Sequence, residues 1–416
     1  MMRYMSHPYR SVALANAAIV VACAALLFNL APDIANAATP KASFEVSGWI
    51  PYWRTATGTA DVLPHLSQLT EINPFGFTVK QDGSLFDAAN LVGSSSPWSA
   101  LISTAHADHV RVIPTVMWSD TNAIDAVLSN KTLRKAHEDA IVAMVNQNGF
   151  DGVDIADEGK KASDMPYYAA FLKELYAKMG KKWVSCTIEA RTPPSSLYTT
   201  IPKDLQYAND YTAINKYCDR VKLMTYDQGI IDLKLDASSP QPYSPIADPA
   251  WVTKVVQLAA KSISKSKLVI GVATYGYEYQ VMPSADGSYD YSLLSAFNPR
   301  YATDLATSLS ITPSRNSAGE LSFSYVPKAL AAQGLQNQDQ LSSYAPAGTP
   351  TALLAALGAV KYAQAAGKQS PFYFEDWSDS QAIAAKVALA KSLGVRGVAL
   401  FKFDGGEDPN MWSVLP

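Results

Sequence analysis

One short stretch, Phe150-Asp151-Gly152-Val153-Asp154-Ile155-Ala156-Asp157-Glu158, decides how the rest of the chain is interpreted. Its apolar and polar residues alternate with the period of two that a β-strand imposes. Apolar side chains therefore point to one face, and Asp154, Ala156 and Glu158 point to the other. Carboxylates on a buried strand face are costly unless they are paired or used. The stretch predicts a catalytic strand with Glu158 at its carboxyl-terminal tip.

Two other interpretations of this stretch stay open at this point. A solvated acidic turn after an edge strand would contain the same residue types, and short motifs of this kind produce false positives. A calcium-binding loop fits less well, because position 153 would need an oxygen ligand and holds valine.

Apolar β-type runs alternate with amphipathic helical segments from about residue 45 onward. The runs are rich in Val and Ile, as strands buried on both faces should be. The predicted strands are Glu45–Tyr52, Glu71–Val79, Val110–Val116, Phe150–Ala156, Trp183–Ile188, Arg220–Thr225, Leu268–Thr274 and Arg396–Phe401. Helices are predicted at Leu133–Asn148, Asp164–Met179, Pro249–Ile263 and Ser378–Leu393. This order indicates an α/β protein, a (β/α)8 TIM barrel.

The competing fold is a doubly wound open sheet, which would usually show a glycine-rich phosphate loop after the first strand. The chain has Tyr52-Trp53-Arg54 there. The regular spacing breaks once, because residues 277–371 separate the seventh and eighth runs. A structureless loop of that length would be unusual. We predict a small α+β insertion on the catalytic rim, with a hairpin (Leu309–Thr312 and Glu320–Val326) and a helix (Thr351–Ala366).

The first residues are typical of a secretory signal peptide. Arg3 and Arg10 precede the apolar run Val12–Phe28, and Ala35-Asn36-Ala37 fits a small-residue cleavage site. The predicted organisation is a signal peptide over residues 1–37, a spacer over 38–44 and the barrel domain over 45–416. The protein is then secreted or lies in the cell envelope, without stable membrane insertion after cleavage. An uncleaved anchor is the alternative, although the run is slightly short for a membrane span.

The amino-acid composition limits which binding partners the protein is expected to have. The 416 residues are 48% hydrophobic and 17% charged, which supports a sizeable core. The formal net charge is −3 without a long charged run, so we expect neither nucleic acid nor an anionic membrane as a partner. We expect a monomer. None of the five histidines shows zinc-ligand spacing with a Cys or Glu partner, so no metal or other cofactor is expected.

Two cysteines follow the predicted cleavage site, Cys186 and Cys218. An oxidising compartment would permit a disulfide between them, but the sequence does not give their separation in space. Because free cysteine is readily buried, we expect two buried free thiols rather than a bridge.

The carboxyl ends of the predicted strands carry aromatic and acidic residues, and barrel active sites gather at those ends. Rings stack on pyranose faces and carboxylic acids protonate glycosidic oxygens, so this combination suits a sugar polymer. A single aromatic residue is more often part of the core, and the argument depends on their shared location. The candidate substrate-binding residues are Tyr52, Trp53, Phe75, Trp118, Glu189, Arg191, Met224, Tyr275 and Phe401.

Several motifs now show a resemblance to a known family. Residues 151–158 (DGVDIADE) resemble the DGxDxDxE strand of glycoside hydrolase family 18, the chitinase family. Met224-Thr225-Tyr226-Asp227 and Leu268–Tyr277 are similar to its sixth and seventh strands. The tail, with Phe374-Glu375-Asp376 and residues 382–412, resembles the branch of spore-germination and cell-wall N-acetylglucosaminidases. The resemblance extends over about residues 45–416.

The resemblance implies a retaining mechanism assisted by the substrate's own N-acetyl group. Glu158 would be the general acid and later the base for water. Tyr226 would hydrogen-bond the acetamido carbonyl, and Asp227 would hold the sugar at the cleavage site. Asp154 would lie deeper and raise the pKa of its neighbours through like charge.

The chain departs from the family pattern at Ala156, where the middle acid should orient the acetamido N–H. Asp157 is adjacent, but strand parity sends it toward the helices unless a bulge reverses the tip. Loss of a charge-assisted hydrogen bond in the transition state costs about 2–4 kcal/mol. A second departure is Phe401, where many members have tryptophan under the sugar.

Three functions remain in competition. The first is a secreted hydrolase of N-acetylglucosamine-containing polymer, either peptidoglycan or chitin-like. The second is a barrel that binds glycan without turning it over, which rests on Ala156. The third is a hydrolase for a glycan whose sugar needs no acetamido orientation. Fold alone does not decide among them.

Overall fold

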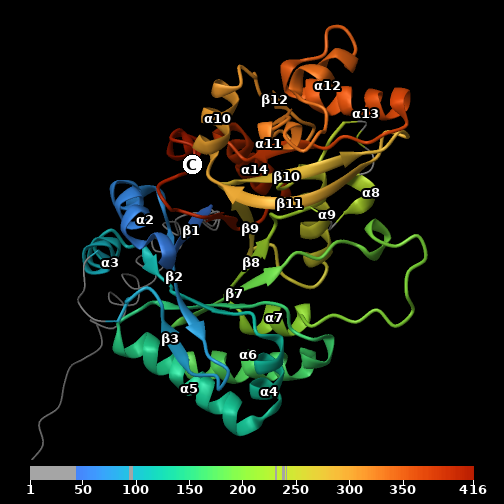
Figure 1. Cartoon of the computed structure of the whole chain (residues 1–416). Helices are drawn as coiled ribbons and strands as arrows, with labels where there is room; N and C mark the ends of the chain where they lie inside the picture. The colour runs from blue at the N-terminus through green and yellow to red at the C-terminus, as the bar shows by residue number, and fades with distance from the viewer. Residues whose placement is uncertain (1–43, 93–96, 230–231, 237–238, 240) are drawn as a thin grey trace, which may run out of the picture. The chain divides into compact units, whose positions relative to one another are not determined.

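The computed structural model describes residues 44–92, 97–229, 232–236, 239 and 241–416 (Figure 1). The predicted signal peptide, its cleavage site and residues 38–43 of the spacer lie outside these residues. Within the described ranges, no helix combines the length and the apolar character that a bilayer crossing requires.

A closed parallel barrel forms the main sheet, because β1 pairs with both β2 and β15. Its strands are β1 (Glu45–Pro51), β2 (Glu71–Val79), β4 (Arg111–Val112), β5 (Thr115–Trp118), β6 (Gly152–Asp157), β7 (Trp183–Glu189), β8 (Arg220–Met224), β9 (Leu268–Ala273) and β15 (Gly397–Phe401). The short β3 (Leu85–Asp87) pairs antiparallel with β2. Each predicted run contains a strand, so the (β/α)8 barrel is confirmed. Only the third run is divided, into β4 and β5, on either side of Pro114, which has no N–H for the ladder.

The helices between these strands cover the outside of the barrel (Figure 1). They are α2 (Thr55–Val62), α3 (Trp98–Ala107), α4 (Thr121–Ser129), α5 (Lys131–Gln147), α6 (Met165–Met179), α7 (Tyr211–Tyr217), α8 (Leu233–Asp236), α9 (Pro249–Ala259) and α14 (Ser380–Leu393). All four predicted helices are present. Asp248 caps α9 through a hydrogen bond from Ala250 N–H, and Gly394 ends α14 in the left-handed region.

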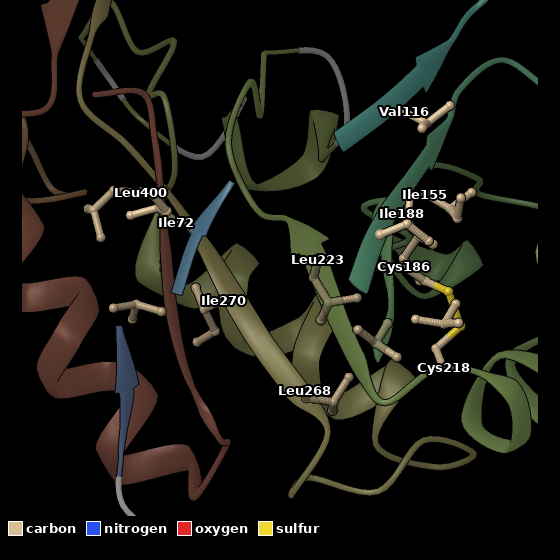
Figure 2. Packing of buried hydrophobic residues seen from close by; sticks show 14 of the residues in the cluster. Ile72, Val116, Ile155, Cys186, Ile188, Cys218, Leu223, Leu268, Ile270 and Leu400 are labelled. Atoms are coloured by element: carbon tan, nitrogen blue, oxygen red, sulfur yellow. A yellow bond between two sulfur atoms is a disulfide. The ribbon is translucent and has the colours of Figure 1, made fainter. Parts of the chain in front are cut away.

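An apolar layer between strands and helices holds the barrel together. Alternate strand residues such as Val116, Ile155 and Ile188 point into it and are almost completely buried (Figure 2). Burial of each such side chain contributes about 1.5–3 kcal/mol relative to exposure. The opposite residues of the same strands face the barrel interior, and this alternation positions the candidate site.

A disulfide joins Cys186 of β7 to Cys218, which ends α7, with 5.9 Å between the two Cα atoms (Figure 2). The expectation of two free thiols is therefore wrong. Cys186 faces the helix layer, and the segment after α7 brings Cys218 beside it at the start of the neighbouring strand. The sequence indicated the face of Cys186 but not this proximity.

The insertion is a five-stranded antiparallel sheet with the strand order β11-β10-β14-β13-β12. Its strands are β10 (Gly276–Pro283), β11 (Tyr289–Phe297), β12 (Ser314–Arg315), β13 (Leu321–Tyr325) and β14 (Phe372–Trp377). Its helices are α10 (Pro299–Ser308), α11 (Lys328–Ala331), α12 (Gln338–Tyr344) and α13 (Leu354–Ala366). The predicted bounds were too narrow, because β14 belongs to this sheet. The hairpin exists, but its first strand is β12, since Leu309 still caps α10.

Candidate active site

Glu158 lies at the carboxyl-terminal tip of β6, where the strand leaves the barrel. Its backbone N–H donates to the Trp118 carbonyl at 2.7 Å, and Gly159 then turns the chain with a positive φ of 68°. The Glu158 side chain is half-buried. Burial raises the pKa of Glu158, and the carboxylates of Glu189 and Asp227 raise it further, while Lys160 opposes them. A carboxyl group in this setting is suited to donate a proton near neutral pH.

Asp154 lies deeper in the barrel, as predicted, and is fully buried. Its carboxylate accepts hydrogen bonds from Trp49 Nε1 (3.0 Å), Thr115 Oγ1 (2.9 Å) and Thr187 Oγ1 (2.8 Å). The Lys222 ammonium stands 3.8 Å away. Asp154 raises the pKa of the Tyr226 phenol, while the carboxylates that raise the pKa of Glu158 are Glu189 and Asp227.

Charged side chains also fill the barrel interior below Asp154. These residues were not among the predicted site residues. Lys222 Nζ lies 2.9 Å from Glu71, and Glu71 also contacts Arg111 at 3.3 Å. At the next level Glu45 accepts from Arg220 at 2.6 and 2.7 Å. The signal was available, because a lysine inside the apolar run of β8 needs a buried partner.

Ala156 occupies the inward position between Asp154 and Glu158 and is only 1% exposed. It pairs with Met117 of β5, so a methyl group stands where the family pattern has a carboxylate. Asp157 is equally buried and faces the helix layer, as parity predicts, where its charge acts on Tyr168 of α6. Burial, opposed by Lys160, raises the pKa of Asp157 to about 7. Asp157 therefore does not replace the missing acid.

Trp118 was predicted as a sugar platform, and the structure contradicts this. Its ring is 1% exposed and lies 5.2 Å from the imidazole of His137, within the apolar layer. Trp118 pairs with Asp157 across β5 and β6, so both side chains share the outward parity. A ring without an exposed face cannot stack on a sugar.

Tyr226 and Asp227 follow β8 and face the tips of the neighbouring strands. The Tyr226 ring stacks on Phe401 with 5.4 Å between centroids, and burial raises the pKa of its phenol well above the ordinary value. Asp227 adopts a positive φ of 57°. Its Oδ1 accepts hydrogen bonds from the hydroxyls of Tyr275 and Tyr277. The carboxyl group is open to solvent on one side, yet the surrounding protein desolvates it and raises its pKa.

A cleft of about 500 Å³ opens beside Asp227. Its lining residues are Trp53, Arg54, Asp227, Tyr275, Tyr277, Ala296, Phe297, Asn298, Phe401, Lys402 and Asp404. Trp53 is half exposed, and Phe75 contacts both Trp53 (5.9 Å) and Phe401 (6.1 Å) edge to face. The exposed Tyr52 contacts Trp53 at 4.9 Å. Met224 packs against the cluster formed by Tyr226 and Tyr275. All the predicted aromatic residues except Trp118 therefore line this cleft or contact a residue that does.

A second cavity, of about 670 Å³, lies on the other side of Asp227 and Tyr277, which line both. We call it the tyrosine cavity, because its wall contains Tyr243, Tyr277, Tyr279, Tyr289 and Tyr291. Four of these rings come from β10 and β11 of the insertion. The period-two spacing of tyrosines within each of these strands is a sequence signal for one shared face of the sheet.

Glu189 and Arg191 follow β7 and have different surroundings. Glu189 Oε1 accepts from Gly159 N–H at 2.9 Å and Oε2 from Asn209 Nδ2 at 2.9 Å. The Arg191 guanidinium lies between the rings of Tyr207 (3.7 Å) and Tyr211 (4.3 Å). Arg191 therefore supports the loop before α7 and does not line either cavity at Asp227. In the described part of the chain, no three His, Cys, Asp or Glu side chains are placed to hold a metal ion.

The chain is similar to several bacterial proteins in sequence. A Bacillus subtilis (strain 168) protein named "Uncharacterized glycosylase YvbX" is 28% identical over 211 residues. This match covers 50% of the chain and 56% of the relative, so it spans little more than half of that protein. The cortical fragment-lytic enzyme of the same organism is 22% identical over 352 residues, which are 83% of the chain and 67% of that enzyme.

Solved structures share the fold. The spore cortex-lytic enzyme SleL of Bacillus cereus superposes with a TM-score of 0.64 at 18% identity, covering 90% of this chain and 74% of that one. A chitinase from Chromobacterium violaceum ATCC 12472 gives a TM-score of 0.63 at 15% identity, covering 90% and 98%. The family model described as "Glycosyl hydrolases family 18" matches residues 46–406. Since this match includes the barrel, the acidic strand and the insertion, the chain belongs to glycosyl hydrolases family 18.

Proposed function

We propose that this protein is a secreted glycoside hydrolase that cleaves β-linked N-acetylglucosamine-containing polysaccharide with retention of configuration. One observation carries the proposal. Glu158 is a half-buried carboxyl group at the end of β6, and the carboxylates of Glu189 and Asp227 favour its protonated form. Asp227, whose charge acts on Glu158, also lines a cleft with aromatic side chains at the strand ends, as a sugar-binding site requires.

In the proposed reaction, Glu158 donates its proton to the glycosidic oxygen, and the bond from that oxygen to the anomeric carbon breaks. The carbonyl oxygen of the substrate's acetamido group attacks the same carbon and forms an oxazolinium ion. Glu158, now a carboxylate, takes a proton from the water that opens this ion. The Tyr226 hydroxyl would donate to the acetamido oxygen, and Asp227, held by two tyrosine hydroxyls, would accept from the sugar.

A second function is supported by Ala156. No carboxylate stands at that inward position, and Asp157 faces away from the site. Without a partner for the acetamido N–H, the barrel would lose about 2–4 kcal/mol of transition-state stabilisation. The alternative is therefore a lectin-like barrel that holds glycan and turns it over very slowly.

The substrate belongs to one of two polymer classes. Relatives named as cortex-lytic enzymes and as a chitinase direct the test to peptidoglycan and to chitin oligomers. The buried disulfide between Cys186 and Cys218 supports action in an oxidising, extracytoplasmic compartment. We propose that a single chain suffices for activity, because the residues invoked here belong to one barrel and its insertion.

The test measures the release of reducing ends from peptidoglycan and from chito-oligosaccharides by the wild type and by Glu158→Gln. The proposed hydrolase releases ends, and the variant loses activity by about 10²–10⁴-fold. Equal background release from both proteins would reject the hydrolase. Binding of the same oligomers, measured by calorimetry, would then support the lectin-like alternative.

A further inference from the structure

The family pattern places a carboxylate at position 156, next to the proton donor along the strand, and this chain has alanine there. A carboxylate nevertheless stands beside Glu158, on the neighbouring strand. The register of β6 and β7 pairs Asp154 with Ser185 and Ile155 with Cys186. Continued by three residues, it places Glu158 opposite Glu189. The hydrogen bond from Gly159 N–H to Glu189 Oε1 (2.9 Å) is consistent with that register.

Glu189 is held in place at both oxygens. Oε1 accepts from Gly159 N–H, and Oε2 accepts from Asn209 Nδ2 at 2.9 Å. The Lys160 ammonium lies 3.7 Å from Oε2. Burial opposes ionisation of Glu189, but Lys160 and these hydrogen bonds hold its pKa below the ordinary value. Glu189 is therefore a fixed negative charge at neutral pH.

The other charged groups that act on Glu158 come from two neighbouring segments. Asp227, after β8, adds a second negative charge. Lys160, on the loop after β6, is the cation whose charge opposes these two carboxylates. Its ammonium also donates to the Asp157 carbonyl and lies 4.6 Å above the Tyr168 ring. These contacts, together with the ion pair to Glu189, hold the Lys160 ammonium on the helix side of the tip of β6.

We infer that Glu189 is a positioning residue whose fixed negative charge keeps the proton on Glu158, in a site where position 156 offers no carboxylate. The proton stays on Glu158 until the glycosidic oxygen takes it. Glu189 itself neither gains nor loses a proton. The inference rests on the proposed function of Glu158 as proton donor.

The first experiment does not depend on turnover. Protein labelled with ¹³C at the glutamate carboxyl carbons is titrated by NMR, and the Glu158 signal is assigned by its loss in Glu158→Gln. In Glu189→Gln, which keeps the side-chain volume and an acceptor for Gly159, we expect the Glu158 midpoint at lower pH. Asp210→Asn is the matched control, because it removes a negative charge from the loop that joins β7 to α7 and keeps the cap of α7. A midpoint that stays unchanged in Glu189→Gln overturns the inference.

The second experiment separates proton donation from structural damage. A 4-nitrophenyl glycoside has a good leaving group and needs little protonation, whereas an N-acetylglucosamine oligomer needs it fully. Above the pH optimum we expect Glu189→Gln to lose kcat/KM on the order of tenfold for the oligomer and much less for the aryl glycoside. For the oligomer, the alkaline limb of the pH profile of kcat/KM moves to lower pH in Glu189→Gln. In Glu189→Asp, which keeps the negative charge, we expect this limb to lie closer to its wild-type position. Equal losses on both substrates with an unmoved limb overturn the inference.

The two proposals fail in different ways. If the wild type hydrolyses no substrate while the NMR midpoint still moves in Glu189→Gln, the hydrolase proposal is rejected and the coupling between the two carboxyl groups stands. If hydrolysis depends on Glu158 but the midpoint does not move, only the role of Glu189 is rejected.

Discussion

Glu278 of β10 and Glu375 of β14 stand opposite each other across adjacent antiparallel strands of the insertion sheet, and both side chains are buried. Glu278 accepts a hydrogen bond from the Tyr325 hydroxyl at 2.8 Å. Burial, and then the hydrogen bond and negative charge of Glu278, raise the pKa of Glu375 to about 10. Glu375 therefore keeps its proton at neutral pH.

This pair predicts that stability falls as pH rises. Between the ordinary value of 4.5 and about 10, the folded chain keeps a proton on Glu375 that the unfolded chain releases. The free energy of unfolding then decreases by at most about 1.4 kcal/mol per pH unit. Glu375→Gln cannot ionise, so we expect it to be more stable than the wild type at pH 8–9 and similar at pH 4. Urea denaturation across this pH range measures the difference. Asp290→Asn, at an exposed position of the same sheet, is the control, and an equal slope in Glu375→Gln and wild type contradicts the prediction.

The disulfide predicts a loss of stability on its removal. Cys186 and Cys218 are separated by 32 positions, and a bridge across such a loop contributes about 3–4 kcal/mol. We expect the double variant Cys186→Ala, Cys218→Ala to unfold at lower denaturant concentration. Thiol alkylation of the unfolded wild type followed by mass measurement is the direct check. Labelling of both cysteines without prior reduction would show that no bridge forms.

We predict a large loss of stability when the charge of one buried side chain, that of Lys222, is removed. It is 1% exposed and balances Glu71 at 2.9 Å and Asp154 at 3.8 Å. Lys222→Met leaves Asp154 without a cation and Glu71 with Arg111 alone, which should lower the free energy of unfolding by about 3–5 kcal/mol. Lys261→Met, at an exposed position, should change it by less than about 0.5 kcal/mol. Similar denaturation midpoints for the two variants would show that the barrel interior does not depend on this balance.

Tyr277→Phe tests how Asp227 is held. The variant removes one of the two hydroxyls that donate to Asp227 Oδ1 and leaves the ring in both cavities. A lost hydrogen bond of this kind costs about 0.5–1.5 kcal/mol, so kcat/KM should fall by about threefold to tenfold. Tyr289→Phe is the control, since it changes a hydroxyl of the tyrosine cavity without a bond to Asp227. If both variants lose activity equally, the tyrosine hydroxyls bind substrate and the support of Asp227 is secondary.

Ala156→Asp tests whether position 156 and Glu189 serve the same purpose. In the Glu189→Gln background, a carboxylate at 156 should return the alkaline limb of the pH profile toward its wild-type position. In the wild-type background it should raise kcat by about 10²-fold or more if acetamido orientation is the missing element. No gain in either background would show that the inward position does not limit catalysis.

The barrel could be predicted from the sequence because two-sided burial makes each strand a continuous apolar run, and strand parity then sorts its residues by face. Parity placed Asp154, Ala156 and Glu158 inward and Asp157 outward, as the structure has them. Parity applied to Trp118 would have predicted its burial too, since it pairs with Asp157.

Contacts between distant segments could not be read in this way. The bridge between Cys186 and Cys218 depends on the path of the chain after α7. The partner of Asp154 is Lys222, two strands away in the barrel order, and no local pattern joins them. The neighbour that acts most strongly on Glu158 through its charge is Glu189, which the sequence placed at a strand end without indicating its distance from the proton donor.

The pairing of β10 with β14 brings the two ends of the insertion together. Gly276 lies opposite Trp377, so the chain enters and leaves the insertion at neighbouring points. The insertion is also held to the barrel away from these ends, because Glu320 accepts hydrogen bonds from the N–H groups of Ile246 and Ala247. Because its two ends meet, a change of length within residues 276–377 need not shift the register of the barrel strands. Residues of this segment line both cavities at Asp227, so such a change would reshape the binding surface while Glu158 keeps its place at the end of β6.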